Sequence, residues 1–291
     1  MSANDSLTLA ASQTRADAGI SATTFAADSD EQRRVELGRF LKTKRAAIAP
    51  ESVGLSATAR RRVEGLLREE VAQRAGISLT WYVWMEQGRE ITPSVDVLEH
   101  LADALLMTEA ERDHLMTLAR PDPALRWMSD FSREAPDGLK QWIAGLDQPA
   151  YALNGRWDVL AWNEAAREML ADFDAVPEAD RNILRMIFLW PEWRELFLEW
   201  QCLAASAVAQ FRAETARYAG HGEVEQLTAD LCRDSDLFAS LWNAREVDRP
   251  RLKTKRLRHP KFGDLELSYA PLQPRGVAED LSVIVYAPIG Q

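Results

Sequence analysis

The segment Leu67–Gly88, LREEVAQRAGISLTWYVWMEQG, constrains the fold of this chain more than any other stretch. Val71, Ala72 and Ala75 recur at helical spacing and so predict a short helix with one apolar face. Gly76 follows it, and glycine is the residue that most easily adopts the left-handed backbone at a helix end. The spacing therefore predicts a helix that stops abruptly in a tight turn.

A second short helix is predicted directly after that turn. Ser78 can cap it through its hydroxyl, and Tyr82 and Met85 fall on its inward face. Two short helices joined by a glycine turn predict a helix-turn-helix, in which the second helix enters the major groove of DNA. A helical hairpin within an ordinary core has the same spacing, so the motif needs support from its surroundings. The residues predicted to face DNA here are Arg68, Ser78, Thr80, Val83, Trp84 and Arg89.

Charge supplies part of that support. The whole chain has a formal net charge of −10, yet residues 31–90 contain 12 Lys or Arg against 8 Asp or Glu. A locally basic module is what neutralisation of DNA phosphates requires. Arg60, Arg61 and Arg62 lie in a link with several helix breakers just before the motif. We predict that they contact the DNA backbone or enter a minor groove, and a solvated charged loop is the alternative. Lys42, Lys44 and Arg45 are either further phosphate contacts or a solvated helix face.

Further helices flank the motif and complete a domain. Apolar spacing predicts one helix before it, at about Gln32–Ala47, and two after it, at about Ser94–Leu106 and from Thr108 onward. Pro121 and Pro123 then mark a boundary. We expect a tail without sustained structure at residues 1–30, a five-helix DNA-binding domain at 31–120 and a second domain at 124–291.

The second domain is predicted to contain an antiparallel sheet covered by helices. Asn154-Gly155 joins two short alternating runs, which indicates a hairpin whose two turn residues both have positive φ. Three further strands are expected near Leu252–Arg258, Leu265–Leu272 and Leu281–Tyr286, and a long helix over Pro191–Tyr218. The fold class is therefore mainly α with an α+β second domain, in a PAS-like arrangement of five strands.

An aromatic stripe suggests a ligand pocket in this domain. Trp193, Phe197 and Trp200 continue with Ala204, Val208 and Phe211 at spacings of three and four along the predicted helix. Such a stripe can pack on the sheet, form a dimer seam or line a pocket. Polar groups that could converge on a ligand are Arg185, Arg212, His259 and Tyr269. An arginine would suit a carboxylate, because it donates two parallel hydrogen bonds.

Both halves of the chain resemble known families. The pattern AQRAGIS…W…MEQGR is similar to the lambda-repressor-like helix-turn-helix (XRE) family. The segments ALNGRWDVLAWNEAAREML, NILRMIFL, SDLFASLW and RHPKFGDLELSYAPL resemble the ligand-binding domain of MmyB-like regulators, which also carry an arginine-rich insertion before the helix-turn-helix. The resemblance implies a bacterial transcription regulator that accommodates a fatty-acid-like molecule. Many relatives carry Arg where this chain has Trp84, so the bases it reads are not implied.

Other classes of protein find little support. The sequence has no G-x-S-x-G, P-loop, H-E-x-x-H or C-x-x-C motif, so we expect no enzyme, no cofactor and no metal. It has neither an apolar run long enough for a membrane span nor a signal peptide, and we expect a cytoplasmic protein. The expected partners are double-stranded DNA, a small hydrophobic ligand and a second copy in a homodimer. The alternative is a protein-interaction module with a degenerate helix-turn-helix and no ligand.

Overall fold

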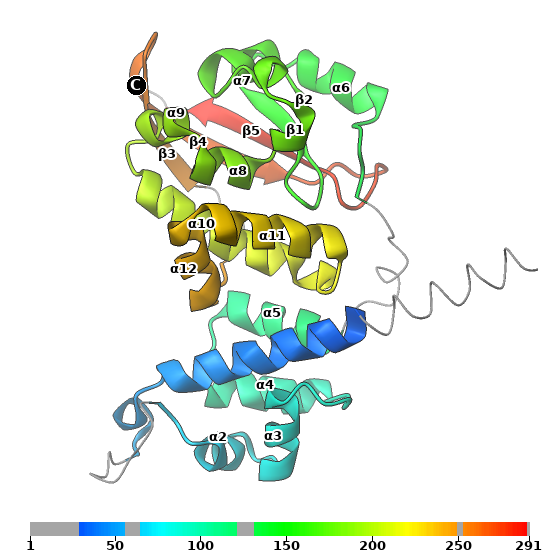
Figure 1. Ribbon diagram of the computed structural model, residues 1–291, viewed down its shortest axis with the longest axis vertical. Helices are drawn as coiled ribbons and strands as arrows, with labels where there is room; N and C mark the ends of the chain where they lie inside the picture. The colour runs from blue at the N-terminus through cyan, green and yellow to red at the C-terminus, as the bar shows by residue number, and fades with distance from the viewer. Residues whose placement is uncertain (1–28, 56–64, 121–130, 249–252, 290–291) are drawn as a thin grey trace, which may run out of the picture. The chain divides into compact units, whose positions relative to one another are not determined.

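The computed structural model describes residues 29–55, 65–120, 131–248 and 253–289 (Figure 1). The chain divides into two compact units, one built mainly from the amino-terminal part and the other mainly from the carboxyl-terminal part. Arg60, Arg61 and Arg62 lie outside the described residues, as do most of the residues of the predicted tail. None of the described helices is both long enough and apolar enough to cross a lipid bilayer.

The amino-terminal unit is helical, as predicted. Its first helix covers residues 29–47 and is followed by the short 3-10 helix η1 (Pro50–Val53). The helices α2 (Arg68–Ala75), α3 (Leu79–Glu86) and α4 (Val95–Ala104) follow. Of the next helix, α5 (Glu109–Ala119), the part from Leu115 onward belongs to this unit. Within this unit α2 packs on α3 and α4, and Phe40 and Leu41 of the first helix are fully buried. The predicted helix-turn-helix is thus held by an apolar core.

The turn between α2 and α3 forms as the glycine predicted. Gly76 has φ 65°, and its N–H donates to the carbonyl of Gln73 at 3.2 Å. The N–H of Ile77 reaches back to the carbonyl of Ala72 at 3.0 Å, which satisfies another carbonyl at the end of the helix. A residue with a Cβ would be strained at this φ, so the glycine fixes where α2 ends and α3 begins.

The carboxyl-terminal unit contains the five-stranded antiparallel sheet expected from the sequence. The strands are β1 (Ala150–Leu153), β2 (Val159–Trp162), β3 (Lys253–His259), β4 (Gly263–Leu272) and β5 (Ser282–Pro288). Their order across the sheet is β2-β1-β5-β4-β3, so β1 pairs with the last strand of the chain. The fold class predicted from the sequence is confirmed: a helical helix-turn-helix unit precedes a unit with an antiparallel sheet and helices.

The hairpin between β1 and β2 differs from the prediction. Asn154 does not have positive φ; the left-handed residue in this connection is Trp157, with φ 68°. Trp157 donates its backbone N–H to the carbonyl of Asn154, and the Asn154 side chain accepts from Arg156 and Asp158. The predicted two-residue turn was therefore wrong. A longer loop forms because the Asn154 side chain closes it internally and the Trp157 side chain is buried.

Seven helices of the described residues accompany the sheet. They are α6 (Asp137–Ala144), α7 (Glu164–Met169), α8 (Ile183–Leu189), α9 (Pro191–Leu196), α10 (Trp200–Thr215), α11 (Gly222–Asp234) and α12 (Asp236–Ala244). The single long helix predicted over Pro191–Tyr218 was wrong, because the chain is extended at Phe197. There Phe197 bridges to Leu257, and Leu198 donates its N–H to the carbonyl of Arg256 at 2.9 Å. Pairing with the edge strand β3 thus interrupts the helix.

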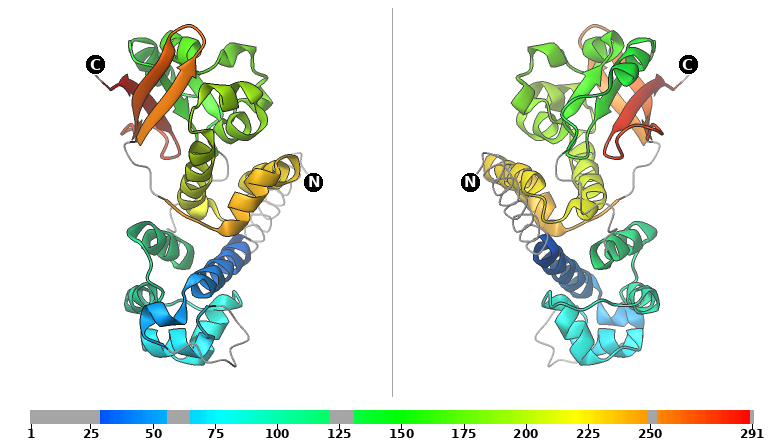
Figure 2. Two further views of the ribbon diagram at one scale, coloured as in Figure 1. Left: turned by 90° about the vertical axis from the view of Figure 1, so that its left-hand side faces the viewer. Right: turned by 90° about the vertical axis from the view of Figure 1, so that its right-hand side faces the viewer.

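The two faces of the sheet differ in character. One carries the small residues Ala150, Ala152 and Ala161, on which α6 packs. The other carries tyrosines of three neighbouring strands, Tyr151, Tyr269 and Tyr286. Figure 2 shows β4 and β5 in orange and red at one side of this unit, with the green helices beside them. The small residues let a helix approach closely, whereas the tyrosines fill a wider space.

Candidate functional site

Helix α3 is the candidate DNA-reading element, and its orientation is fixed by two buried residues. Ser78 caps the helix by accepting a hydrogen bond from the backbone N–H of Trp81 at 3.1 Å. Tyr82 and Met85 are fully buried in the amino-terminal unit, as the spacing predicted. Because they point inward, the residues between them must point outward. Leu79 and Thr80, in the first turn before Tyr82, are the most exposed residues of α3.

The outward face of α3 is mostly apolar. Thr80 is exposed, Val83 and Trp84 are half-buried, and the guanidinium of Arg89 lies 5.7 Å from the centre of the Trp84 ring. Leu79, which the sequence analysis did not single out, is 44% exposed at the first position of the helix. Methyl and hydroxyl groups of this kind suit contact with thymine methyls better than bidentate hydrogen bonds to guanine. The exposed position of Leu79 after the capping serine is a signal that could have been read from the spacing.

A carboxylate holds this helix to the rest of the unit. Glu86, whose side chain is 1% exposed, accepts from Nε of Arg45 at 2.6 Å and from Nε of Arg68 at 2.5 Å. Arg45 also donates to the carbonyl of Leu66 at 2.7 Å. Burial alone would raise the pKa of Glu86, but the hydrogen bonds from the two arginines outweigh it and lower the pKa. This Glu86 clamp joins the first helix, the start of α2 and the end of α3.

The clamp changes how two predicted phosphate contacts are interpreted. Arg45 is buried in the clamp, so its guanidinium is not on a solvated helix face. Arg68 is 46% exposed at its side chain and remains accessible while it pairs with Glu86. Gly38 makes the close packing possible, because a Cβ there would lie 2.4 Å from the carbonyl oxygen of Glu86. No local pattern distinguishes Arg45 from its basic neighbours Lys42 and Lys44.

In the carboxyl-terminal unit, the residues predicted to bind a ligand fall into separate groups. Trp193 and Phe197 are both buried, with ring centres 5.3 Å apart. Among the described side chains, Nε1 of Trp193 is a buried donor without a hydrogen-bond acceptor. Phe197 also lines a cavity of about 180 Å³ between the start of α10 and β3, together with Leu203, Lys255 and Arg256. Of the two aromatic residues, Phe197 therefore lies beside a hollow.

Tyr269 belongs to the aromatic face of the sheet next to this cavity. Its ring centre lies 5.8 Å from that of Tyr286, and Nζ of Lys255 lies 4.9 Å from the Tyr269 ring centre. The hydroxyl of Tyr286 is 3.4 Å from that of Tyr151. Burial raises the pKa of Tyr286 to about 12 and that of Tyr151 well above its usual range, so both hydroxyls stay protonated. The tyrosines supply neutral donors inside an apolar layer.

Four predicted ligand contacts are engaged elsewhere. Arg185 pairs with Asp230 of α11 at 3.3 Å, and Nε1 of Trp200 donates to the carbonyl of Ile187 at 2.8 Å. Arg212 is buried, stacks 3.8 Å from the ring centre of Trp242 and donates to its carbonyl. His259 contacts the carbonyl of Glu168 through Nε2 at 2.9 Å, and its Nδ1 accepts from two backbone N–H groups. The structure does not bring these four together with Phe197.

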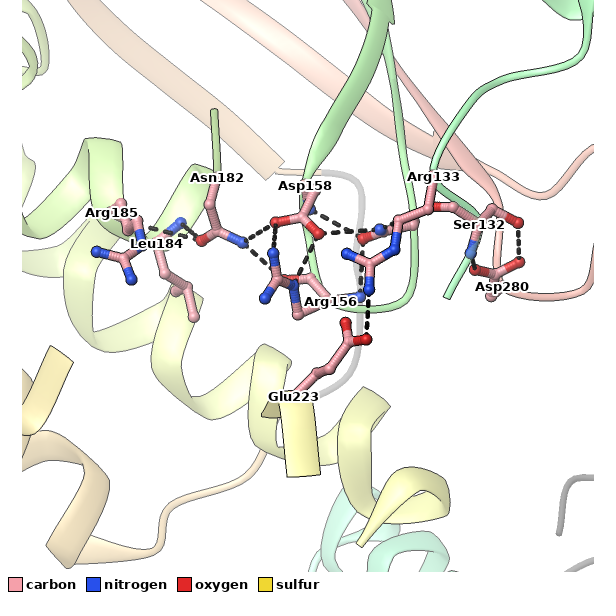
Figure 3. A network of polar contacts seen from close by, with 10 residues as sticks. Ser132, Arg133, Arg156, Asp158, Asn182, Leu184, Arg185, Glu223 and Asp280 are labelled. Carbon is pink, nitrogen blue, oxygen red and sulfur yellow. Dashed lines mark hydrogen bonds and ion pairs between the residues drawn. The ribbon is translucent and has the colours of Figure 1, made fainter. Parts of the chain in front are cut away.

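A polar network that the sequence analysis missed braces the same unit (Figure 3). Asp158 accepts from both Arg156 and the side-chain amides of Asn154 and Asn182. Asn182 also caps α8, and Asp280 accepts from the backbone and hydroxyl of Ser132 at 2.7 Å each. Both carboxylates have hydrogen-bond partners within the unit, as polar groups in a folded core usually do. No group of acidic, His or Cys side chains that could hold a metal occurs among the described residues.

Comparison with known proteins gives two matches that follow the order of the two units. Residues 36–115 match a family described as a helix-turn-helix domain. Residues 135–290 match a family described as the ligand binding domain of MmyB-like transcription regulators, which covers more than half of the chain. No curated protein matches the sequence. The matches include α3 in the first segment and the cavity beside Phe197 in the second.

Proposed function

Because the chain belongs to the family of MmyB-like transcription regulators, we propose that it is a sequence-specific DNA-binding regulator controlled by a small hydrophobic ligand. In the proposal the ligand is fatty-acid-like and changes the affinity for DNA. The protein acts as a homodimer in the cytoplasm, where the chromosome lies. The observation that carries the proposal is the exposed first turn of α3 in a unit that matches a helix-turn-helix domain.

For DNA, the proposal assigns three kinds of contact. Leu79, Thr80, Val83 and Trp84 face the bases, and their apolar character favours sites that contain thymine methyls. Arg68 and Arg89 contact phosphates, together with Arg60, Arg61 and Arg62 of the link before α2. Ser78 fixes the start of the helix and offers its backbone at the phosphate. Two such helices in a dimer reach successive major grooves about 34 Å apart.

For the ligand, the proposal centres on the cavity beside Phe197. Phe197 and Leu203 give it an apolar wall, while Lys255 and Arg256 add positive charge at its edge. Arg256 lies 3.5 Å from Glu199, and the ammonium group of Lys255 lies over the ring of Tyr269. A ligand carboxylate could replace or join these partners. At about 180 Å³ the cavity holds only the polar end of a fatty acid, and the acyl chain would pass toward Trp193 and the tyrosine face.

The other predicted ligand contacts have supporting roles in this proposal. Arg185, Trp200, Arg212 and His259 hold α8, α10, α11 and the β3 end in place around the site through the contacts given above. Their substitution is expected to reduce the stability of the unit together with ligand affinity. Substitution of Lys255 is expected to reduce ligand affinity alone.

A second candidate function follows from the apolar face of α3. An interaction module with a degenerate helix-turn-helix would present such a face to another protein, since it offers few hydrogen bonds to bases. The two candidates differ in their salt dependence. Phosphate contacts make DNA affinity fall steeply as salt rises, whereas an apolar protein contact changes little.

The test begins with selection of bound duplexes from a random pool by the purified protein, followed by fluorescence anisotropy on the selected duplex. Thr80→Glu places a negative charge on the exposed first turn of α3 and should weaken binding at least about tenfold. Asn243→Asp adds the same charge at an exposed position of α12 and is the matched control. Failure to select any sequence, or equal binding by both variants, would contradict the proposal.

A further inference from the structure

Arg68 is the first residue of α2, and the chain just before it is fixed on the first helix. Leu66 donates its backbone N–H to the carbonyl of Arg45 at 3.0 Å and accepts a hydrogen bond from Nη1 of Arg45 at 2.7 Å. Leu67 donates its backbone N–H to the carboxylate of Glu70 at 2.7 Å, which caps the helix. The backbone from which the Arg68 side chain extends is therefore held in place.

The side chain of Arg68 is held as well, at one of the nitrogens of its guanidinium. Nε donates to Oε2 of Glu86 at 2.5 Å, while the Arg68 side chain is 46% exposed. Nη1 and Nη2 have no hydrogen-bond acceptor among the residues that the structure describes. Because a guanidinium is planar and rigid, a fixed Nε limits the directions in which the other two nitrogens can donate. Arg68 therefore offers two oriented donors to a partner outside the unit.

The carboxylate of Glu86 is shared by two arginines, of which one is buried and one is at the surface. Arg45 donates to it through Nε at 2.6 Å and is itself buried. Two positive guanidinium groups and one negative carboxylate leave one positive charge, and only Arg68 can present that charge to solvent. The bond to Glu86 thus orients Arg68 without neutralising it. A phosphate group fits such an arginine, because it accepts two parallel hydrogen bonds from one guanidinium.

We propose that Glu86 is a positioning residue for DNA binding: it holds Nε of Arg68 so that Nη1 and Nη2 donate to one phosphate while α3 lies in the major groove. Glu86 is the last residue of α3, so one side chain links the helix that reads bases to the phosphate contact at the start of α2. Glu86 itself does not touch the DNA. The inference rests on the proposed function, since it explains how one of the proposed phosphate contacts is oriented.

A double-mutant cycle of Arg68→Ala and Glu86→Gln tests this role by fluorescence anisotropy of the full chain on the selected duplex. Circular dichroism first identifies a temperature at which all variants are folded. Arg68→Ala should weaken binding and flatten the slope of log affinity against log salt by about 0.9, the value for one phosphate. Glu86→Gln should weaken binding about fivefold, because the nitrogen of the amide cannot accept from Arg68 and the free side chain must then be ordered on binding. Charge alone predicts the opposite, since loss of a carboxylate favours binding to a polyanion.

The second half of the cycle separates positioning from support of the fold. If Glu86 acts through Arg68, Glu86→Gln should have no further effect on affinity once Arg68 is replaced by Ala. If Glu86 only supports α3, both backgrounds should lose affinity by the same factor. Asp230→Asn is the matched control, because Asp230 also pairs with two arginines, Arg185 at 3.3 Å and Arg233 at 2.9 Å, in the carboxyl-terminal unit. It should leave DNA affinity and the salt slope unchanged.

Arg68→Lys tests the same role without disturbing the buried pair of Arg45 and Glu86. Lysine keeps the positive charge but has a single nitrogen, which must serve both the carboxylate and the phosphate. Arg68→Lys should therefore bind the duplex at least about threefold more weakly than the wild type, with no change in thermal stability.

Equal losses in both backgrounds, unchanged or tighter binding by Glu86→Gln, or wild-type affinity in Arg68→Lys would overturn the inference. So would a wild-type salt slope in Arg68→Ala, because Arg68 would then contact no phosphate. In each of these cases the wild type still binds its selected duplex, and the proposed function stands. Failure of the wild type to select any sequence would refute the proposed function and the inference with it.

Discussion

Removal of the charge on Glu86 should destabilise the amino-terminal unit strongly. Glu86→Gln keeps the shape of the side chain but leaves the guanidinium of Arg45 without its carboxylate partner. Glu86 is 1% exposed and Arg45 is similarly buried, so the pair lies in a region of weak screening. Loss of one partner from a buried pair costs about 3–5 kcal/mol, because an uncompensated charge stays behind. For Glu86→Gln we expect the free energy of unfolding to fall by about 3 kcal/mol, the lower end of this range, because the glutamine amide oxygen can still accept one hydrogen bond.

The exposed partner of Glu86 supplies the comparison. Arg68 is 46% exposed, and pairs of this kind contribute about 0–1 kcal/mol. Arg68→Ala should therefore cost less than about 1 kcal/mol while Arg45 still holds Glu86.

Urea denaturation of the full chain gives the free energies, and hydrogen exchange followed by mass spectrometry assigns the change to residues 29–47 and to α3. Equal costs for Glu86→Gln and Arg68→Ala, or faster exchange confined to the carboxyl-terminal unit, would refute the reasoning.

Three further predictions concern the same unit. Because the pKa of Glu86 is lowered in the folded protein, its carboxylate stabilises the fold above the ordinary pKa of 4.5, and this contribution is lost as the pH falls below that value. Acid titration of the wild type should show this loss of stability, and the same titration of Glu86→Gln should not. Gly38→Ala should lower the free energy of unfolding, measured with urea, by more than about 2 kcal/mol, because the new Cβ would collide with a backbone oxygen. Gly138→Ala is the control: its Cβ meets open space, so the free energy of unfolding should stay the same or rise. Ser78→Ala removes the cap of α3, so it should lower the free energy of unfolding by about 1 kcal/mol and also weaken DNA binding. Ser94→Ala removes the cap of α4, so it should lower the free energy of unfolding by the same amount and leave DNA affinity unchanged.

Local features of the fold could be predicted because their causes are local. Gly76 and Ser78 set the turn of the helix-turn-helix, and the spacing of Tyr82 and Met85 set the buried side of α3. The strands were likewise visible as alternating runs bounded by turn residues. In each case the deciding interaction lies within a few residues of the signal.

The errors arose where distant residues decide the structure. The predicted long helix breaks at Phe197 because the chain pairs there with β3, about 60 residues later. The turn at Asn154 is longer than predicted because the Trp157 indole donates to Glu214 at 2.8 Å and packs on Phe211. No local pattern contains either partner.

The candidate sites were predictable to different degrees for the same reason. The residues predicted to face the bases lie on one helix, so a single helical period groups Thr80, Val83 and Trp84. The residues predicted to contact a ligand come from several elements, and Arg185, Arg212 and His259 have partners far along the chain. The Glu86 clamp escaped prediction because Arg45 and Glu86 are 41 residues apart.

The most direct test of the central claim is the salt dependence of binding to the selected duplex. If α3 reads bases while basic residues neutralise several phosphates, the logarithm of affinity should fall with the logarithm of salt with a slope of about −3 or steeper, and replacement of Arg60, Arg61 and Arg62 by Ala should flatten that slope. A shuffled duplex should bind at least about 100-fold more weakly. Equal affinity for both duplexes would contradict the account, because the exposed face of α3 would then read no sequence.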